Sequence, residues 1–225
     1  MSKVDFDEFA NNYDDILKEQ LFLFERDTAF FSQHKVSLTK KLLKHRPVRI
    51  LEFGCGVGNN IRYFASLFPD VSITGCDISQ RCLDIAIKEN PSAKFFLLTS
   101  TADSICGNFD LVFIANVLHH INPNQRHDTL SFIKSLTVNN GELFIFEHNP
   151  YNPVTRHIVR TCPFDADAEL IKPRHLIALL KKAGFSIIER QYILFFPSFL
   201  SGLRPMERYL KSLPLGGQYV VHASL

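Results

Sequence analysis

The stretch ILEFGCGVGNN (50–60) joins a short apolar run to a turn in which every second residue is glycine, namely Gly54, Gly56 and Gly58. The apolar run is typical of a buried strand, and residues 59–68 have the apolar spacing of a helix. In open parallel sheets, a glycine-rich turn between the first strand and the next helix lies where ligands bind. The stretch therefore predicts a ligand-binding turn in an α/β fold.

Strand and helix patterns alternate along the rest of the chain. Apolar runs predict further strands at 71–76, 93–98, 109–115, 141–147, 185–196 and 218–223. Helical spacing occurs at 18–45, 79–89, 124–136 and 174–182, whereas 150–172 has an irregular, proline-rich pattern. This order predicts one doubly wound, mostly parallel seven-stranded sheet.

Composition narrows the class of protein. A chain of 225 residues with 46% hydrophobic residues suits a single domain, 1–225. Its net charge of +2 and scattered basic residues argue against a nucleic-acid partner. The acidic N-terminus lacks an apolar signal core, and we find no apolar run near the ~20 residues that span a bilayer, so we expect a cytoplasmic protein. The five cysteines form no CxxC pair, and we predict neither a disulfide framework nor a metal site.

The acidic residue before the turn helps to distinguish a phosphate-bearing ligand from a cationic one. A dinucleotide fingerprint needs a glycine where this chain has Asn59. Glu52 would repel a pyrophosphate, but its charge suits a cationic ligand. The turn therefore favours a cation over a phosphate.

The pattern acid-x-Gly-x-Gly-x-Gly after a first strand resembles the class I S-adenosylmethionine-dependent methyltransferases, which have a Rossmann-like fold. The resemblance implies S-adenosyl-L-methionine as cofactor and S-adenosyl-L-homocysteine as product. It places Glu52 near the ammonium group of the cofactor and Asp77, about 20 residues further on, at the ribose hydroxyls. The other cofactor contacts that it implies are Gly54, Cys55, Gly56, Gly58, Ile78, Thr101, Ala102, Asn116 and, from an N-terminal flap, Tyr13. Thr101 departs from the family pattern, which has an acid at this adenine-contacting position.

Histidines at strand ends are the candidates for a general base. His120 follows the fourth strand and His148 follows the fifth, at the edge that borders the acceptor site in this fold. Because His119 and His120 are neighbours, we expect at most one of them to face the pocket. A general base is not obligatory, because methyl transfer from a sulfonium can proceed with alignment and desolvation alone.

Two segments after the fifth strand are candidates for acceptor binding. We predict substrate contacts from Asn149, Tyr151 and Phe164. Asp165 and Asp167 could also shape the acceptor pocket, but we favour their interpretation as solvated acids. Amino-methyltransferases that act on nucleic-acid bases carry a motif with two prolines after the fourth strand. The sequence Asn149-Pro150-Tyr151 lacks the second proline and follows the fifth strand, so it does not match this motif. The second segment carries apolar residues that we expect to cover the acceptor site: Phe195, Phe196, Phe199, Leu200 and Leu203.

The sequence thus predicts an S-adenosylmethionine-dependent methyltransferase acting at oxygen or nitrogen of a small or lipid-like molecule. Within the domain we expect an N-terminal helical cap (1–46), a cofactor-binding core (47–148) and acceptor-side loops with the last strands (149–225), the final one antiparallel. A catalytically silent S-adenosylmethionine-binding module or sensor remains an alternative, and an NAD(P)-dependent oxidoreductase is a more distant one. The sequence leaves open peripheral membrane contact and the choice between monomer and homodimer.

Overall fold

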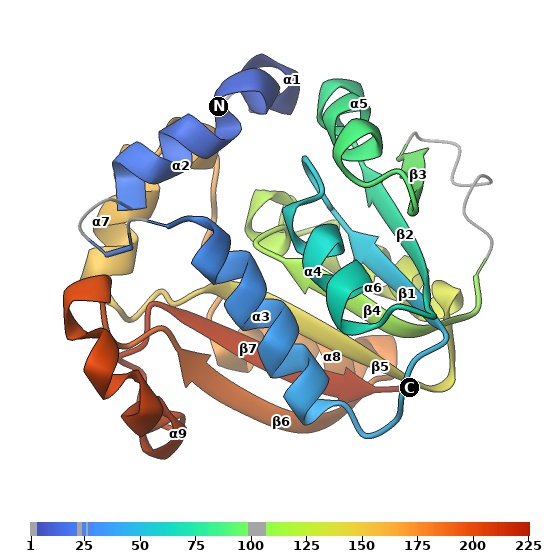
Figure 1. Cartoon of the computed structure of the whole chain (residues 1–225). Coiled ribbons are helices and arrows are strands. Elements are labelled where there is room, and N and C mark those ends of the chain that lie inside the picture. The colour runs from blue at the N-terminus through green and yellow to red at the C-terminus, as the bar shows by residue number, and fades with distance from the viewer. Residues whose placement is uncertain (1–3, 22–23, 26, 99–106) are drawn as a thin grey trace.

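The computed structural model describes residues 4–21, 24–25, 27–98 and 107–225, and its centre is a seven-stranded sheet (Figure 1). The strand order is β3-β2-β1-β4-β5-β7-β6, and β7 runs antiparallel to both of its neighbours. The bounds are β1 Arg49–Phe53, β2 Ser72–Asp77, β3 Lys94–Leu97, β4 Phe109–Ala115, β5 Thr137–His148, β6 Ser186–Ile193 and β7 Gln218–Ser224. The predicted mostly parallel sheet with a C-terminal antiparallel strand is confirmed.

Helices cover both faces of this sheet (Figure 1). One core contains buried side chains of α6 and α8, and the opposite core contains those of α3, α4 and α5. The N-terminal and sheet-packing helices are α1 Phe6–Phe9, α2 Tyr13–Leu21, α3 Ala29–Leu42, α4 Asn59–Leu67, α5 Gln80–Glu89, α6 Arg126–Leu136 and α8 Pro173–Ala183.

The central strand β4 shows why this sheet needs two covered faces. Val112 and Ile114 point into the first core, whereas Leu111 and Phe113 point into the second. All four side chains are fully buried, as the two-residue repeat of a strand requires when both faces are covered. Burial of one such side chain contributes about 1.5–3 kcal/mol.

Local sequence signals set the helix ends. The Ser79 hydroxyl accepts a hydrogen bond from the Cys82 N–H and caps α5, a role for which serine is strongly preferred. Gly184 ends α8 with a left-handed φ of 94°, which glycine adopts without a steric penalty.

The segment 150–172 corrects the prediction of irregular structure. It contains the helix α7 Pro153–Thr161 and a short 3₁₀ helix, η4 Pro163–Asp165. The Asn152 side chain caps α7 by accepting from two backbone N–H groups, and Pro153 occupies its first turn. The sequence contains this capping residue, but the nearby prolines led to the prediction of irregular structure.

The chain between β6 and β7 is also helical. It forms η5 Ser198–Met206 and α9 Glu207–Leu210. Over the described ranges, no helix has both the length and the apolar character needed to cross a bilayer.

Candidate functional site

A cavity of about 940 Å³ lies at the carboxyl ends of the central strands. The turn after β1, the end of β2 and the residues after β4 and β5 contribute to its wall, together with α3, α7 and η4. In an open α/β sheet, this edge is the usual position for a ligand site. Its volume is at the upper end of the range for small-molecule pockets, about 300–1,000 Å³.

The glycines of the β1 turn are required by backbone geometry and by close packing. Gly54, Gly56 and Gly58 all have positive φ angles, of 74°, 51° and 81°. A Cβ atom on Gly54 would lie 2.4 Å from Val117 Cγ2, whereas one on Gly56 would meet nothing within 4 Å. The backbone at Gly56 therefore borders the open cavity, so a ligand can approach it closely.

Asp77 lies at the end of β2 beside this turn. Its carboxylate accepts hydrogen bonds from the Gly56 N–H at 2.7 Å and the Ser79 N–H at 3.0 Å. Burial raises the pKa of Asp77, although these backbone N–H groups oppose the rise. Two carboxylate oxygens carry about four acceptor sites, so the group retains capacity for a ligand in the cavity that it lines. The next residue, Ile78, lines the same cavity and is half exposed.

Three buried oxygen atoms near the turn accept no hydrogen bond from any described residue: Glu52 Oε2, Asn60 Oδ1 and Asn116 Oδ1. Asn60 and Asn116 line the cavity, and the Asn60 Nδ2 group donates to Glu52 Oε1 at 2.6 Å directly behind it. Asn116 holds a left-handed φ of 57° at the exit of β4. Buried polar atoms rarely remain unpaired, so these three indicate a ligand rich in hydrogen-bond donors.

A buried lysine that the sequence reasoning missed faces the same region. Lys35 comes from α3, is 6% exposed and lines the cavity. Burial lowers its pKa to about 8, although the nearby carboxylates Glu52 and Glu147 favour its charged form. The helical pattern of α3 could not reveal that this lysine points toward the sheet.

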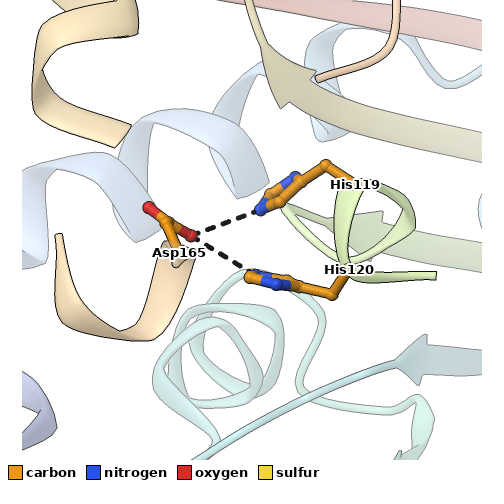
Figure 2. A group of neighbouring side chains, drawn as sticks. All are labelled: His119, His120 and Asp165. Carbon is orange, nitrogen blue, oxygen red and sulfur yellow. Dashed lines mark ion pairs between the residues drawn. The ribbon is translucent and has the colours of Figure 1, made fainter. Parts of the chain in front are cut away.

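The histidines after β4 contradict the prediction that at most one of them faces the pocket. His119 and His120 both line the cavity, from the 3₁₀ helix η3 Leu118–His120. Their Nε2 atoms lie 3.5 Å and 3.3 Å from Asp165 Oδ1 (Figure 2). On the other side of His120, Asp167 Oδ1 lies 3.0 Å from its Nδ1 atom. The two acids are therefore paired with histidines, which corrects their interpretation as solvated.

His119 is the most deeply buried member of this group. Its Nδ1 atom lies 2.6 Å from Glu147 Oε2 on β5. Burial alone would lower the pKa of His119, but the Glu147 and Asp165 carboxylates outweigh it and raise that pKa to about 10. The ring of His148 lies 5.1 Å from that of His119, and burial together with the charge on His119 lowers the pKa of His148 to about 4. His148 is therefore neutral at pH 7.

The N-terminal segment packs against the cavity, as expected of a flap. Phe6 of α1 and Gln20 of α2 line it, and the Val4 N–H donates to Asp167 Oδ2. Tyr13 begins α2, but its side chain lies outside the described part of the chain. The predicted contacts of Thr101 and Ala102 also fall outside the described residues.

The predicted acceptor contacts divide into two groups. Phe164 is buried and lines the cavity. Asn149 lies outside the cavity wall, because its Nδ2 group donates to the carbonyls of Pro214 and Gly216 and its Oδ1 accepts from the Tyr151 N–H. The Tyr151 side chain is 39% exposed and also lies outside the wall. The structure therefore places neither side chain in the cavity wall, and their substrate-binding roles stay predictions.

The predicted apolar cover is also corrected. Several of its side chains point to solvent beyond the cavity, including Phe199 at 76% exposed, Leu200 and Leu203. Glu207 binds the backbone N–H groups of Leu194, Phe195 and Phe196 and holds this segment against the end of β6. The cavity is instead covered by α7, η4 and the N-terminal helices.

Comparison with known proteins agrees with this arrangement. Residues 51–143 match the family model of a methyltransferase domain. A malonyl-[acyl-carrier protein] O-methyltransferase from Legionella pneumophila is 39% identical over 82 residues, which are 34% of this chain and 28% of that protein. The chain spans less than half the length of the curated relatives that it matches, 41% of one and 28% of another.

Solved structures share the fold over nearly the whole chain. An S-adenosylmethionine-dependent methyltransferase from Thermotoga maritima has a TM-score of 0.67 at 19% identity, covering 97% of each chain. Another from Archaeoglobus fulgidus has a TM-score of 0.66 at 16% identity and covers 95% of this chain and 100% of its own. Residues 51–143 thus resemble a methyltransferase domain, and the solved structures show that nearly the whole chain has the fold of S-adenosylmethionine-dependent methyltransferases.

Proposed function

We propose that the chain transfers the methyl group of S-adenosyl-L-methionine to an oxygen or nitrogen atom of a small or lipid-like acceptor. The observation that carries the proposal is the set of three unpaired buried acceptors, Glu52 Oε2, Asn60 Oδ1 and Asn116 Oδ1, beside the glycine turn. The ammonium group of the cofactor carries three N–H donors and a positive charge, which these oxygens would satisfy. A pyrophosphate carries neither N–H donors nor a positive charge, so this arrangement disfavours a nicotinamide dinucleotide.

The other cofactor contacts follow from the strand ends. Asp77 would accept hydrogen bonds from the ribose hydroxyls, and Ile78 would pack against the adenine. The Lys35 ammonium would bind the cofactor carboxylate from the α3 side. Backbone groups at Gly54, Cys55 and Gly56 would approach the ligand closely, and burial keeps the Cys55 thiol neutral by raising its pKa.

The bound cofactor supplies an electrophilic methyl group on a sulfonium sulfur. The acceptor would occupy the part of the cavity lined by Phe164, His120 and His148. His148 is neutral at pH 7 and can take the proton that an O–H or N–H acceptor loses. His120 is the second candidate, although Asp165 and Asp167 already hold both of its ring nitrogens. The name of the Legionella relative supports oxygen as the acceptor atom.

A methyl-transfer assay tests activity against the alternative of a silent binding module. The purified chain is incubated with methyl-labelled S-adenosyl-L-methionine and fractionated small-molecule and lipid extracts. The proposal requires label in an extract compound together with equal formation of S-adenosyl-L-homocysteine. Tight cofactor binding without turnover in any fraction would favour the sensor.

Glu52→Gln should weaken binding of cofactor and product alike, by about 0.5–1.5 kcal/mol, because it keeps the shape but removes the charge near their shared ammonium group. Burial raises the pKa of Glu52 to about 8, so the carboxylate is mostly protonated below that pH. Wild-type affinity should therefore rise as the pH increases from about 6 to 8, and the variant should lack this rise. Titration calorimetry across this range measures both effects.

The matched control is Glu89→Gln, at the exposed end of α5, which should bind both ligands as the wild type does. Loss of affinity for the sulfonium form alone would show that Glu52 reads the sulfur and that its placement at the ammonium group is wrong.

A further inference from the structure

Three potential metal-ligand atoms converge beside the acceptor part of the cavity (Figure 2). They are His119 Nε2, His120 Nε2 and Asp165 Oδ1, and all lie within 4.8 Å of one another. The two histidines come from η3 and the aspartate from η4, so the segment after α7 closes the group from the other side. Two imidazoles and one carboxylate form a donor set typical of divalent transition-metal sites.

Each histidine is oriented by a carboxylate on its other nitrogen. Glu147 Oε2 lies 2.6 Å from His119 Nδ1, and Asp167 Oδ1 lies 3.0 Å from His120 Nδ1. These carboxylates are themselves held, because Glu147 accepts from the Leu118 N–H and Asp167 from the Val4 N–H. Metal-binding histidines almost always donate their second N–H to such a group, which fixes the ring and leaves Nε2 for the metal.

The distances from Asp165 to the two histidines suit a shared metal ion and are longer than ordinary N–H···O hydrogen bonds. In a tetrahedral site with bonds of about 2.0–2.1 Å, neighbouring donor atoms lie about 3.3–3.4 Å apart. Asp165 Oδ1 is 3.5 Å from His119 Nε2 and 3.3 Å from His120 Nε2. The His119 Nε2 atom is fully buried and makes no hydrogen bond to any described residue, although it points at Asp165 (Figure 2). A cation bonded to all three atoms would satisfy it.

We propose that His119, His120 and Asp165 bind a divalent transition-metal ion, with Zn²⁺ the best match to two imidazoles and one carboxylate. Two neutral imidazoles and the carboxylates of Asp165, Glu147 and Asp167 would surround the dication, so its charge is compensated locally. The proposal revises the sequence-based expectation of no metal, which rested on the lack of a CxxC pair.

The same residues line the cavity, so a three-ligand site would leave a coordination position for a water or for an oxygen of the acceptor. The ion would polarise an acceptor hydroxyl bound there, and the neutral His148 would then take its proton more readily. This consequence rests on the proposed methyl transfer, whereas metal binding itself does not. The competing occupants of the site are protons on the two Nε2 atoms, which would make the cluster a network of ion pairs.

The test is a Zn²⁺ titration of chelator-treated protein at pH about 7.5, with a chromophoric chelator as competitor. The wild type should bind about one Zn²⁺ per chain, and His120→Ala and Asp165→Asn should each bind it at least about 10-fold more weakly. The matched control is His157→Ala, an exposed histidine on α7, which should bind as the wild type does. Failure of the wild type to bind stoichiometrically, or equal binding by wild type and ligand variants, would overturn the proposal.

Two further measurements keep the result independent of folding and of methyl transfer. Co²⁺ added to the wild type should give the visible absorption bands of a low-coordinate nitrogen and oxygen site, and one equivalent of Zn²⁺ should abolish them. Absent bands would count against the site without reference to any variant. Variants that still bind S-adenosyl-L-homocysteine are folded. If the wild type binds this product but no metal, the metal-site proposal fails and the proposed methyl transfer is unaffected.

Discussion

Replacing His148 with alanine is expected to lower turnover by about 10²–10⁴-fold, the usual contribution of a general base, while cofactor affinity stays nearly unchanged. His148 lines the cavity at the end of β5, away from the glycine turn and from Asp77 at the end of β2. Single-turnover kinetics and calorimetry measure the two quantities separately.

The pH profile of this reaction should differ from that of an unperturbed histidine. Burial and the neighbouring His119 lower the pKa of His148 to about 4, so its neutral form predominates at higher pH. The sequence alone predicts a transition near pH 6–7, and the structure instead predicts none from this group between about pH 6 and 8.

Two variants serve as controls for His148. His157→Ala changes an exposed histidine on α7 and should leave turnover unchanged. His120→Ala distinguishes the second candidate when it is compared with chelator-treated wild type. A large loss relative to that metal-free protein, with an active His148→Ala variant, would move the base to the end of β4. If His148→Ala keeps most of its activity, His148 is only part of the pocket wall and alignment suffices for transfer.

Asp77→Ala is expected to weaken cofactor binding by about 1.5–3 kcal/mol, or roughly 10-fold to 150-fold, because it removes a charged acceptor from the ribose hydroxyls. The same carboxylate accepts from the Gly56 and Ser79 N–H groups, so alanine should also lower the melting temperature. Affinity from calorimetry and stability from thermal unfolding must therefore be measured together.

The Asp77→Asn variant separates these two effects. Its amide oxygen can still accept from one backbone N–H, so stability should recover more than affinity does. Asp84→Ala, on the exposed face of α5, is the control that should change neither quantity beyond a few tenths of a kcal/mol. Equal cofactor affinity in the wild type and both Asp77 variants would remove Asp77 from the site.

The sequence predicted those parts of the fold that depend on local patterns. The run FDLVFIA predicted β4 with the bounds that the structure shows, because a strand buried on both faces is apolar at almost every position. Ser79 and Gly184 are residue types that commonly lie at helix ends, and both do so here. The glycine turn was equally local, because Gly54, Gly56 and Gly58 all adopt positive φ angles, which glycine tolerates.

The rest of the site depends on contacts between distant segments. Asp165 meets His119 and His120 only because η4 folds back over the end of β4, and the spacing of these residues in the sequence carries no sign of it. The 3₁₀ turn at η3 lets two adjacent histidines converge, whereas an extended chain would separate them. Lys35 was missed for a related reason, because a charged residue on a helix is ordinarily assumed to face solvent.

The exposed apolar segment between β6 and β7 shows a second limit of prediction from sequence. Phe199 and Leu203 suggested a covered surface, and the structure places both in solvent. Hydrophobic composition indicates that a surface is unusual, but it does not indicate which cavity or partner the surface meets.

The most direct test of the account is calorimetric titration of the purified chain with S-adenosyl-L-homocysteine, S-adenosyl-L-methionine and NAD⁺. We expect saturable binding of the first two at one site, weakened by Asp77→Ala and by Glu52→Gln, and no binding of NAD⁺. Binding of NAD⁺ in preference to both adenosyl ligands, or adenosyl binding that neither substitution weakens, would contradict it.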